Sequence, residues 1–293
     1  MRALRTILFA PGDRLSAVNK AISLPRLDVL VVDLEDAVGV NAKEKSRDDL
    51  LQLLPTLKGR RSKYPRVFVR INCPLTSPWG ENDLESIKSH HDVLDGVVIP
   101  KVEASETLEH VAQRLGRYGP SAGIWAMIET ALGIERVGAI CQQSACSGVI
   151  LGSNDLTKSL GATFTPDRSH LMYAMQRTIN AARAHSKPSI DGVYMSLDDD
   201  GKGLEREART GQGRALGFDG KTLIHPKQID IVNAAFSPTA LEVETSKGVI
   251  GAFQEAVVQG KGVAVYKGRL IEALHVEQAR DVLALHESLL SRL

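Results

Sequence analysis

The sequence predicts an α/β fold, a closed (β/α)₈ TIM barrel followed by a C-terminal helical extension. Three observations support this fold. Short apolar, β-branched runs recur along the chain, stretches with helical periodicity separate most of them, and the runs number eight. Eight strand–helix units in about 230 residues are typical of a TIM barrel. The runs are Thr6–Ala10, Val29–Leu34, Arg66–Ile71, Gly96–Pro100, Gly123–Ile128, Gly148–Leu151, Ile190–Tyr194 and Leu216–Ile224.

These runs are continuously apolar, which is typical of strands in a parallel sheet that is covered on both faces. A doubly wound open sheet is the alternative arrangement of alternating strands and helices. That fold would need a glycine-rich phosphate loop after one strand, and neither GxGxxG nor GxxxxGK[ST] follows any of the runs. The pattern therefore favours the barrel.

The segments between the runs carry helical periodicity. In Lys43–Leu57 five leucines share one face. The other clear cases are Glu106–Leu115, Glu135–Gln142 and His170–His185. Their alternation with the apolar runs predicts one helix after each of the strands concerned.

The chain beyond the eighth run predicts a second region. We place the barrel domain at 1–237 and the extension at 238–293. Two helical stretches, Leu241–Val258 and His275–Leu293, flank a segment that reads as a short hairpin or loop, Gly260–Gly268. We expect this extension to complete the active site, of its own or of a neighbouring subunit.

Charge and composition exclude several classes of function. Lys and Arg total 36 against 35 Asp and Glu, and aromatic residues make up 4%, which argues against a nucleic-acid-binding protein. The N-terminal apolar run is too short to span a membrane and lacks a signal-peptide layout. Three cysteines without a Cys/His cluster indicate neither disulfides nor zinc. We therefore expect a cytoplasmic protein with no membrane or nucleic-acid partner.

Two apolar runs end in an acid. VILGSNDL leads to Asp155, and GIWAMIET leads to Glu129. The C-terminal ends of barrel strands meet at one mouth, so acids from consecutive units come together. Carboxylates that converge repel each other unless a cation lies between them, and Mg²⁺ binds one or two carboxylates together with water and substrate oxygens. This predicts magnesium on Glu129 and Asp155. The alternative is that each acid is a helix N-cap or a salt-bridge partner.

Other strand ends supply a cation and further acids. Arg70 ends the third run, where its guanidinium can hold a carboxylate or an enolate oxygen; the alternative is a structural pair with the acids of the second run. Glu35 and Asp36 follow the second run and are expected to orient Arg70 or metal-bound water. His225 is a candidate for catalysis, and the alternative that we favour is an architectural role in its loop.

Several segments together resemble the citrate lyase β-subunit-like family of CoA-ester lyases, within the wider HpcH/HpaI aldolase group. The matching segments are LFAPGDR, VVDLEDAV, VRIN, IPKV, IETALGI, LGSNDL, DGVY and GFDGKTLIHPKQI, which run from Leu8 to Ile229. The resemblance implies a (β/α)₈ barrel, Mg²⁺ on Glu129 and Asp155, and substrate contact by Arg70 beside Glu129. It also implies a homo-oligomer, a trimer or a hexamer.

The resemblance assigns three further residues. Many lyases of this family carry a catalytic Asp in a C-terminal Gly-x-x-x-Asp segment, often across a subunit contact. This chain has Gly268-Arg-Leu-Ile-Glu272, so Glu272 is the implied acid. The loop after the first strand contributes Arg14, and Lys20 follows it; both are candidates for binding the phosphates of CoA. The tail and the neighbouring motifs look closest to the (3S)-malyl-CoA thioesterase branch.

The leading prediction is a Mg²⁺-dependent lyase that cleaves the C–C bond of a short 3-hydroxyacyl-CoA, such as malyl- or citramalyl-CoA, through an enolate. The first alternative is a (3S)-malyl-CoA thioesterase that hydrolyses the thioester. The second is a class II pyruvate aldolase that acts on a free hydroxy-keto acid. A binding or regulatory barrel without catalysis is the reading from a different class; intact Arg70, Glu129 and Asp155 argue against it.

Overall fold

The computed structural model describes residues 4–59, 65–88, 90, 93–116, 123–197, 200–210 and 212–291. The chain forms two compact units. One is Leu4–Ala235, and the other begins at Phe236 and contains the C-terminal part of the chain. The sequence analysis placed the corresponding boundary after Ser237.

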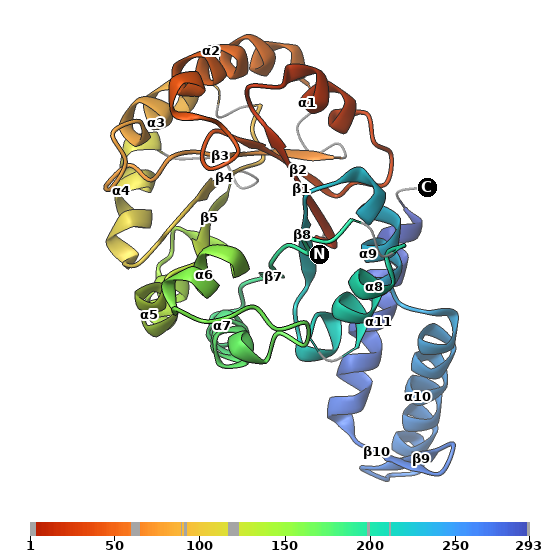
Figure 1. Cartoon of the computed structure of the whole chain (residues 1–293). Helices are drawn as coiled ribbons and strands as arrows, with labels where there is room; N and C mark the ends of the chain where they lie inside the picture. Colours follow the sequence, from red (N-terminus) through yellow and green to blue (C-terminus); the bar gives the residue numbers. More distant parts are fainter. Residues whose placement is uncertain are drawn as a thin grey trace. The chain divides into compact units, whose positions relative to one another are not determined.

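The first unit is a closed barrel of parallel strands, which confirms the predicted fold. Each strand pairs with its neighbour in sequence, and β8 closes the barrel on β1 through pairs such as Ile7 with Thr222. Figure 1 shows the strands at the centre of this unit with the helices around them. The strands are β1 (Thr6–Pro11), β2 (Val29–Asp33), β3 (Arg66–Arg70), β4 (Gly96–Ile99), β5 (Gly123–Ile128), β6 (Cys146–Leu151), β7 (Ser189–Asp191) and β8 (Gly220–Leu223).

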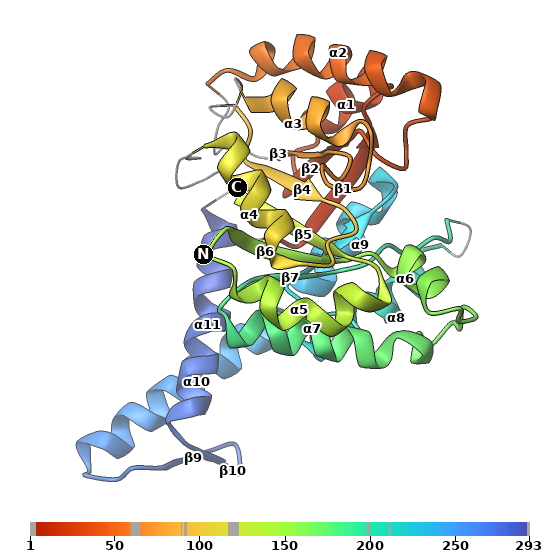
Figure 2. The same ribbon diagram turned by 90° about the vertical axis from the view of Figure 1, so that its left-hand side faces the viewer.

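Helices follow the strands and cover the outside of the barrel, as Figure 2 shows from the side. They are α1 (Leu15–Ile22), α2 (Lys43–Leu53), α3 (Gly80–Lys88), α4 (Ser105–Leu115), α5 (Ala131–Gln142), α6 (Ser153–Ser159), α7 (Met172–Ala184), α8 (Lys202–Arg209) and α9 (Ile229–Phe236). Within the described ranges, no helix of either unit is both long and apolar enough to cross a bilayer.

Two strands, β7 and β8, are shorter than the sequence predicted by two residues or more, and β2, β3 and β4 each end one residue earlier than predicted. The ladder of β7 stops at Asp191, because side chains replace strand partners beyond it: Lys221 Nζ donates to the Gly192 carbonyl over 2.7 Å, and Gln228 Nε2 donates to the Tyr194 carbonyl over 2.9 Å. The eighth apolar run is interrupted before β8 by Gly217, whose φ of 118° is incompatible with a strand.

The barrel interior is filled by side chains from all but one of the strands. Phe68 of β3 and Trp125 of β5 lie with ring centroids 5.7 Å apart. A Cβ at Gly148 of β6 would approach the Trp125 ring to 2.4 Å, so only glycine leaves room for the indole there. The interior is therefore a packed core, and ligand binding is restricted to its ends. The core residues are Ile7, Val29, Val31, Phe68, Val98, Trp125, Met127, Ile150 and Ile190.

The second unit consists of two long helices and a hairpin. The helices are α10 (Ala240–Val258) and α11 (Ala273–Leu290), and the antiparallel hairpin between them is formed by β9 (Ala264–Tyr266) and β10 (Arg269–Ile271). Its own apolar core includes Val249, Ile271 and Val276. The predicted pair of helices with an intervening hairpin is confirmed.

Candidate active site

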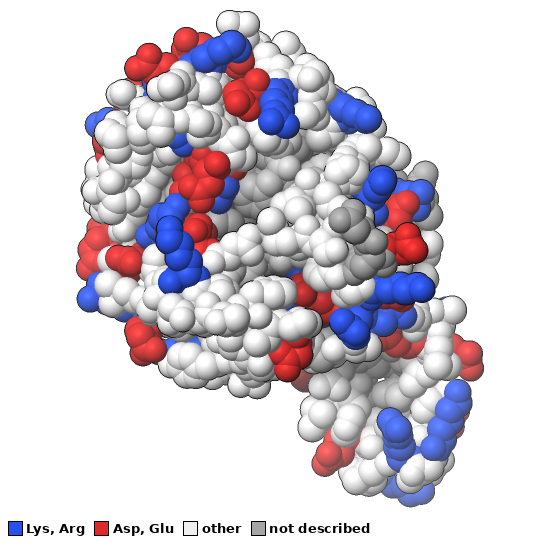
Figure 3. Space-filling model, viewed as in Figure 1, with Lys and Arg blue, Asp and Glu red and all other residues white. Residues whose placement is uncertain are grey.

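The C-terminal ends of the barrel strands surround a cavity of about 430 Å³. Figure 3 shows the mouth as a hollow with acidic and basic side chains next to one another on its rim. Four residues singled out from the sequence line this cavity: Asp36, Arg70, Glu129 and Asp155. The other lining residues are Phe9, Asp33, Ala37, Met127, Leu151, Gly152, Ser153, Asn154, Val193, Met195, Thr222 and Ile224.

Arg70, the last residue of β3, is fixed by the acids that follow β2. Its Nε and Nη2 donate to the two carboxylate oxygens of Asp33 over 2.7 and 2.6 Å, and its Nη1 lies 3.0 Å from Glu35 Oε2. Register explains the pairing, because Asp33 lies opposite Arg70 in the β2–β3 ladder. The predicted structural pair therefore exists, and it holds the guanidinium against the cavity with Phe9 stacked 4.9 Å from it.

The loop that carries Glu35 and Asp36 is tied down from two sides. Asp33 accepts hydrogen bonds from the backbone of Glu35 over 2.9 Å and of Ala37 over 3.2 Å. The buried Lys43 ammonium donates to the carbonyls of Leu34 and Glu35.

Burial acts to lower the pKa of Arg70, but the Asp33 and Glu35 carboxylates outweigh it and raise that pKa. Arg70 is thus a fixed and permanently charged cation.

Glu129 follows β5 directly and is almost fully buried, with 2% of its surface exposed. Its Oε1 accepts a hydrogen bond from the Lys101 backbone over 2.8 Å. Burial raises its pKa to about 7, against the opposing effect of Arg70. Glu129 is not the N-cap of α5, because Thr130 holds that position and accepts from the Gly133 amide.

The turn between β6 and α6 approaches Glu129 so closely that it requires glycine. A Cβ built at Gly152 would lie 2.3 Å from Glu129 Oε2. Gly152 is also the N-cap of α6, so Asp155 lies in the first turn of that helix and does not cap it. The Asp155 side chain is 36% exposed, and its Oδ2 lies 4.0 Å from Lys101 Nζ. The capping alternative is therefore wrong for both acids.

Lys101 is a member of this site that sequence reasoning missed as a functional residue. Its ammonium contacts Glu35 and lies 3.5 Å from Asp36, and its backbone has a φ of 52°, in the left-handed region. The signal available in the sequence was its position directly after the fourth strand, in IPKV. Burial acts to lower the pKa of Lys101, but the hydrogen bond that its ammonium donates to Glu35 and the nearby carboxylates raise that pKa.

The residues of this mouth fit a hard divalent cation. Oxygen ligands suit Mg²⁺, which needs only one or two protein carboxylates. Among the described residues, Glu129 is a buried carboxylate that forms no ion pair with a cationic side chain, and the absence of a Cβ at Gly152 leaves room beside it. Within the same described ranges no group of three His, Cys, Asp or Glu side chains converges as a complete metal site. Five carboxylates face two cations here: Asp33, Glu35, Asp36, Glu129 and Asp155 against Arg70 and Lys101.

Four predicted site residues do not line the cavity. Glu35 is one of them, although it contacts Arg70 and Lys101. The other three are Arg14, Lys20 and Glu272. Arg14 is the exposed N-cap of α1, and Lys20 is exposed in its last turn. Glu272 belongs to the C-terminal unit, where it is the exposed N-cap of α11 and its backbone donates to His275 Nδ1 over 3.0 Å. The roles of Arg14, Lys20 and Glu272 stay predictions.

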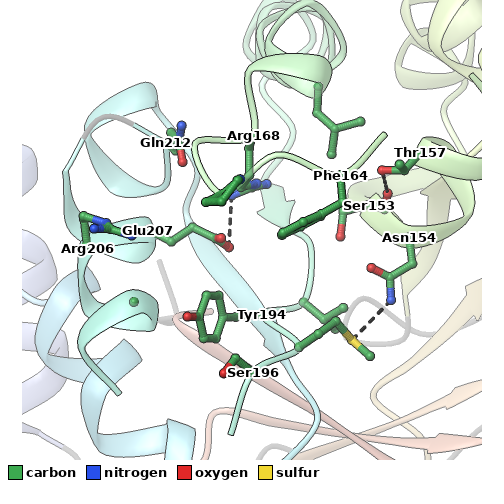
Figure 4. Close-up of a pocket in the computed structure, with 15 residues that line it drawn as sticks. Ser153, Asn154, Thr157, Phe164, Arg168, Tyr194, Ser196, Arg206, Glu207 and Gln212 are labelled. Atoms are coloured by element: carbon green, nitrogen blue, oxygen red, sulfur yellow. Dashed lines mark hydrogen bonds and ion pairs between the residues drawn. The ribbon is translucent and has the colours of Figure 1, made fainter. Parts of the chain in front are cut away.

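A second cavity of about 290 Å³ adjoins the first. The two share Ser153, Asn154, Val193 and Met195 in their walls. Figure 4 shows the contact between Asn154 and the Met195 sulfur, which are 3.2 Å apart, at the side where Thr157 and Phe164 also lie. Sequence reasoning did not find this cavity, because its wall combines residues of α6 and α8 with the segments 164–168 and 193–196, and no periodicity specifies how these come together.

Behind the second cavity lies a buried charge network. Asp191 accepts from both Arg168 and Lys221, over 2.5 to 2.9 Å, and Glu207 lies 2.5 Å from Lys221 and 3.2 Å from Arg168. Asp191 ends β7, and Lys221 lies within β8. Because two cations and two carboxylates compensate each other there, we assign them to holding β7, β8 and α8 together.

His225 has the architectural role expected of it, since its Nδ1 accepts from the Lys227 amide.

Comparison with known proteins agrees with this geometry. Residues 5–226 match the family described as HpcH/HpaI aldolase/citrate lyase. The chain is 40% identical to a (3S)-malyl-CoA thioesterase of Cereibacter sphaeroides, over 97% of this chain and 95% of that protein. It is 30% identical to human mitochondrial citramalyl-CoA lyase, over 97% and 86%.

A solved structure agrees as well. The protein CitE from Mycobacterium tuberculosis, in complex with magnesium, acetoacetate and coenzyme A, is 26% identical and superimposes with a TM-score of 0.79, over 96% of this chain and 97% of that one. A match over most of the barrel, together with relatives that align along nearly the whole chain, leaves one conclusion. This chain belongs to the HpcH/HpaI aldolase/citrate lyase family.

Proposed function

We propose that this protein is a Mg²⁺-dependent enzyme that acts on a short 3-hydroxyacyl-CoA ester with a second carboxylate, of the malyl-CoA type. The observation that carries the proposal is that Arg70, Glu129 and Asp155 line one cavity at the C-terminal mouth of the barrel. Relatives named for malyl-CoA and citramalyl-CoA support the substrate class.

We assign the metal to Glu129 and Asp155. Magnesium bound there would polarise substrate oxygens and lower the pKa of a hydroxyl that it contacts. Glu129 is buried, and a buried carboxylate is stabilised by a cation beside it. Asp155 is partly exposed, so its carboxylate can contact both solvent and substrate. The magnesium in the complex of the Mycobacterium tuberculosis protein supports this choice of ion.

Arg70 supplies the fixed positive charge for the reacting carbonyl. Asp33 holds two of its nitrogens, so the guanidinium does not have to reorganise when negative charge develops on a substrate oxygen. A preorganised cation of this kind stabilises either a tetrahedral oxyanion or an enolate. The arrangement therefore serves both hydrolysis of a thioester and cleavage of the neighbouring C–C bond.

Hydrolysis is the outcome that we place first. Water adds to the thioester carbonyl, the C–S bond breaks, and the sulfur leaves as the CoA thiol after gaining a proton. The 40% identity to a (3S)-malyl-CoA thioesterase along nearly the whole chain favours this outcome over the C–C cleavage that the sequence motifs put first. We assign proton transfer to Glu272, whose carboxylate is exposed on the C-terminal unit.

C–C cleavage is the second candidate, favoured by the similarity to citramalyl-CoA lyase. Here the 3-hydroxyl loses its proton, the bond between C2 and C3 breaks, and a keto acid leaves. The acyl-CoA enolate that remains takes a proton on carbon, which requires an acid. Glu272 is the residue that we assign to this step too.

We propose that the protein is a homo-oligomer in which the C-terminal unit completes a neighbouring barrel. Exposed apolar side chains on that unit support an interface: Val258, Val265 and Leu270 are 88, 69 and 58% exposed. Arg14, exposed at the start of α1, and Lys20, exposed in its last turn, remain our candidates for the CoA phosphates.

Product analysis distinguishes the two outcomes. Metal-stripped enzyme would be supplied with Mg²⁺ and (S)-malyl-CoA, with free thiol and glyoxylate measured separately. Free CoA and malate without glyoxylate would establish hydrolysis. Glyoxylate and acetyl-CoA with little free thiol would establish C–C cleavage. Absence of all these products would reject malyl-CoA as substrate and favour a free hydroxy-keto acid.

A further inference from the structure

Lys101 occupies an unusual place in the candidate site. It follows β4 in the left-handed region, with a φ of 52°, a conformation that non-glycine residues adopt at a cost and that is concentrated at functional sites. This conformation directs two groups of one residue to the same site. The backbone amide donates to Glu129 Oε1 over 2.8 Å, and the ammonium contacts the Glu35 carboxylate.

The ammonium is shared among three acids. Besides Glu35, Nζ lies 3.5 Å from the Asp36 carboxylate and 4.0 Å from Asp155 Oδ2. The side chain is 38% exposed and connects the end of β4 with the β2 loop and the first turn of α6. Lys101 is therefore the more exposed of these two cations. Arg70 is held by Asp33 and is only 10% exposed.

We propose that Lys101 is the residue that sets the metal affinity of this site, by competing as an internal cation for the carboxylates that attract Mg²⁺. This inference rests on the proposed magnesium site at Glu129 and Asp155. A divalent ion bound to Asp155 would lie within a few ångströms of an ammonium that contacts the same carboxylate group, and like charges at that separation repel. Metal entry thus requires the ammonium to withdraw toward Glu35 and Asp36.

The backbone and the side chain of Lys101 have opposite effects. The amide keeps Glu129 Oε1 in place, which favours metal binding, and the ammonium opposes it. When magnesium is scarce, the Lys101 ammonium stays paired with the acids of the site. The free Mg²⁺ concentration then decides whether the metal site is occupied. Lys101 is on this account a positioning residue and takes no part in bond making or breaking.

The test is Mg²⁺ binding, measured by titration calorimetry on chelator-stripped protein, without reference to turnover. Lys101→Met removes the charge and keeps the length of the chain, and Lys101→Arg keeps the charge. Lys101→Gly removes the side chain, suits a positive φ and retains the amide that donates to Glu129. Lys158→Met is the matched control, because Lys158 is an exposed lysine in the last turn of α6, the helix that carries Asp155.

We expect the Met and Gly variants at 101 to bind Mg²⁺ about tenfold more tightly or better than wild type. We expect the Arg variant and the control to stay within about threefold of wild type, because charge at the site is unchanged or screened. The Met variant should also melt at a lower temperature in chelator and regain stability with Mg²⁺.

Equal or weaker binding by both uncharged variants would overturn the inference, and so would tighter binding by Lys101→Arg. If wild type binds Mg²⁺ and Glu129→Gln abolishes it while Lys101→Met changes nothing, the proposed metal site stands and the inference alone fails. If neither wild type nor any Lys101 variant binds Mg²⁺, both fail.

Discussion

At the scale of single residues, the site depends on how each charge is held. Among the described residues, Arg70 is held by Asp33 and Glu35, Glu129 accepts a hydrogen bond from one backbone amide, and Asp155 lies 4.0 Å from the Lys101 ammonium. The acids were predictable from the sequence because the C-terminal ends of neighbouring strands converge. The involvement of Lys101 was not, because neither a left-handed backbone nor the reach of a long side chain leaves a periodic signal.

The raised pKa of Glu129 predicts a pH dependence of stability. Its folded pKa lies above the ordinary value of 4.5, at about 7, so the folded state favours the protonated form. Its contribution to stability is therefore present below pH 4.5 and is lost as the pH rises through 7. In chelator at pH 8, Glu129→Gln should be more stable than wild type by on the order of 3 kcal/mol.

Chemical denaturation at pH 5 and pH 8 measures this difference. Glu109→Gln, an exposed acid on α4, serves as the control and should change little at either pH. Added Mg²⁺ should stabilise wild type at pH 8 and leave Glu129→Gln unaffected. Equal pH dependence in wild type and Glu129→Gln would show that Glu129 does not titrate in this window.

The contacts of the Arg70 guanidinium with Asp33 and Glu35 predict that a positive charge at position 70 is not enough for turnover. Arg70→Lys keeps the charge but cannot contact both oxygens of Asp33 and Glu35 at once. We expect turnover to fall by about a hundredfold or more while Mg²⁺ affinity stays near wild type. Steady-state kinetics beside calorimetry checks both values.

The matched control for this change is Arg5→Lys. Arg5 forms a comparable two-point contact with Asp28, over 3.0 and 3.1 Å, before the first residue of β1, at the opposite end of the barrel from the candidate site. It should lose stability without loss of turnover per folded molecule. A similar drop in turnover for both variants would mean that Arg70 acts only through the fold.

At the scale of elements, the strands were predictable and the loops between them were less so. Continuous apolar runs identified every barrel strand, since burial on both faces excludes polar residues. The predicted end of β7 was wrong because side chains of Lys221 and Gln228 satisfy the carbonyls that a partner strand would otherwise bind. The second cavity escaped prediction because its wall joins α6 and α8 to the segments 164–168 and 193–196, whose course leaves no periodic signal.

The turn from β6 to α6 gives a prediction at this scale. Gly152 has a φ of −91°, which any residue adopts, so Gly152→Ala strains no backbone angle. The new Cβ would lie 2.3 Å from Glu129 Oε2 and 2.5 Å from Glu129 Cβ, so the Glu129 side chain and the backbone next to it must shift. We expect Mg²⁺ affinity to fall by about tenfold or more, with the fold retained.

Calorimetry on the stripped protein measures the effect. Gly138→Ala in α5 is the control, because a Cβ there meets nothing within 4 Å. Alanine in a helix interior should stabilise this variant by about 0.5–1 kcal/mol and leave metal binding unchanged. Unchanged affinity in Gly152→Ala would remove Glu129 from the metal site.

At the scale of the whole molecule, the barrel carries the proposed metal site and the C-terminal unit carries Glu272. The two compact units each have a core of their own. The two-part organisation could be read from the sequence because the apolar β-branched runs stop after the eighth strand. How subunits assemble could not, because a single chain does not record which exposed apolar side chains meet a partner.

Mixed oligomers test whether Glu272 acts across subunits. Glu129→Gln and Glu272→Gln should each be inactive alone, for different reasons. Co-expressed with different tags and purified through both, the two chains should regain activity, because one intact barrel can then use the Glu272 of a neighbour. Full turnover by Glu272→Gln alone would exclude Glu272 from the reaction. If the hetero-oligomers are inactive, each active site uses Glu129 and Glu272 of the same chain.

The most direct measurement of the central claim is the Mg²⁺ requirement for turnover of (S)-malyl-CoA by chelator-stripped wild type and Asp155→Asn. The account predicts that wild type is inactive in chelator, gains activity as Mg²⁺ is added, and does so at a lower concentration than Asp155→Asn by about tenfold or more. Full turnover in chelator, or identical Mg²⁺ titrations for the two proteins, would contradict it.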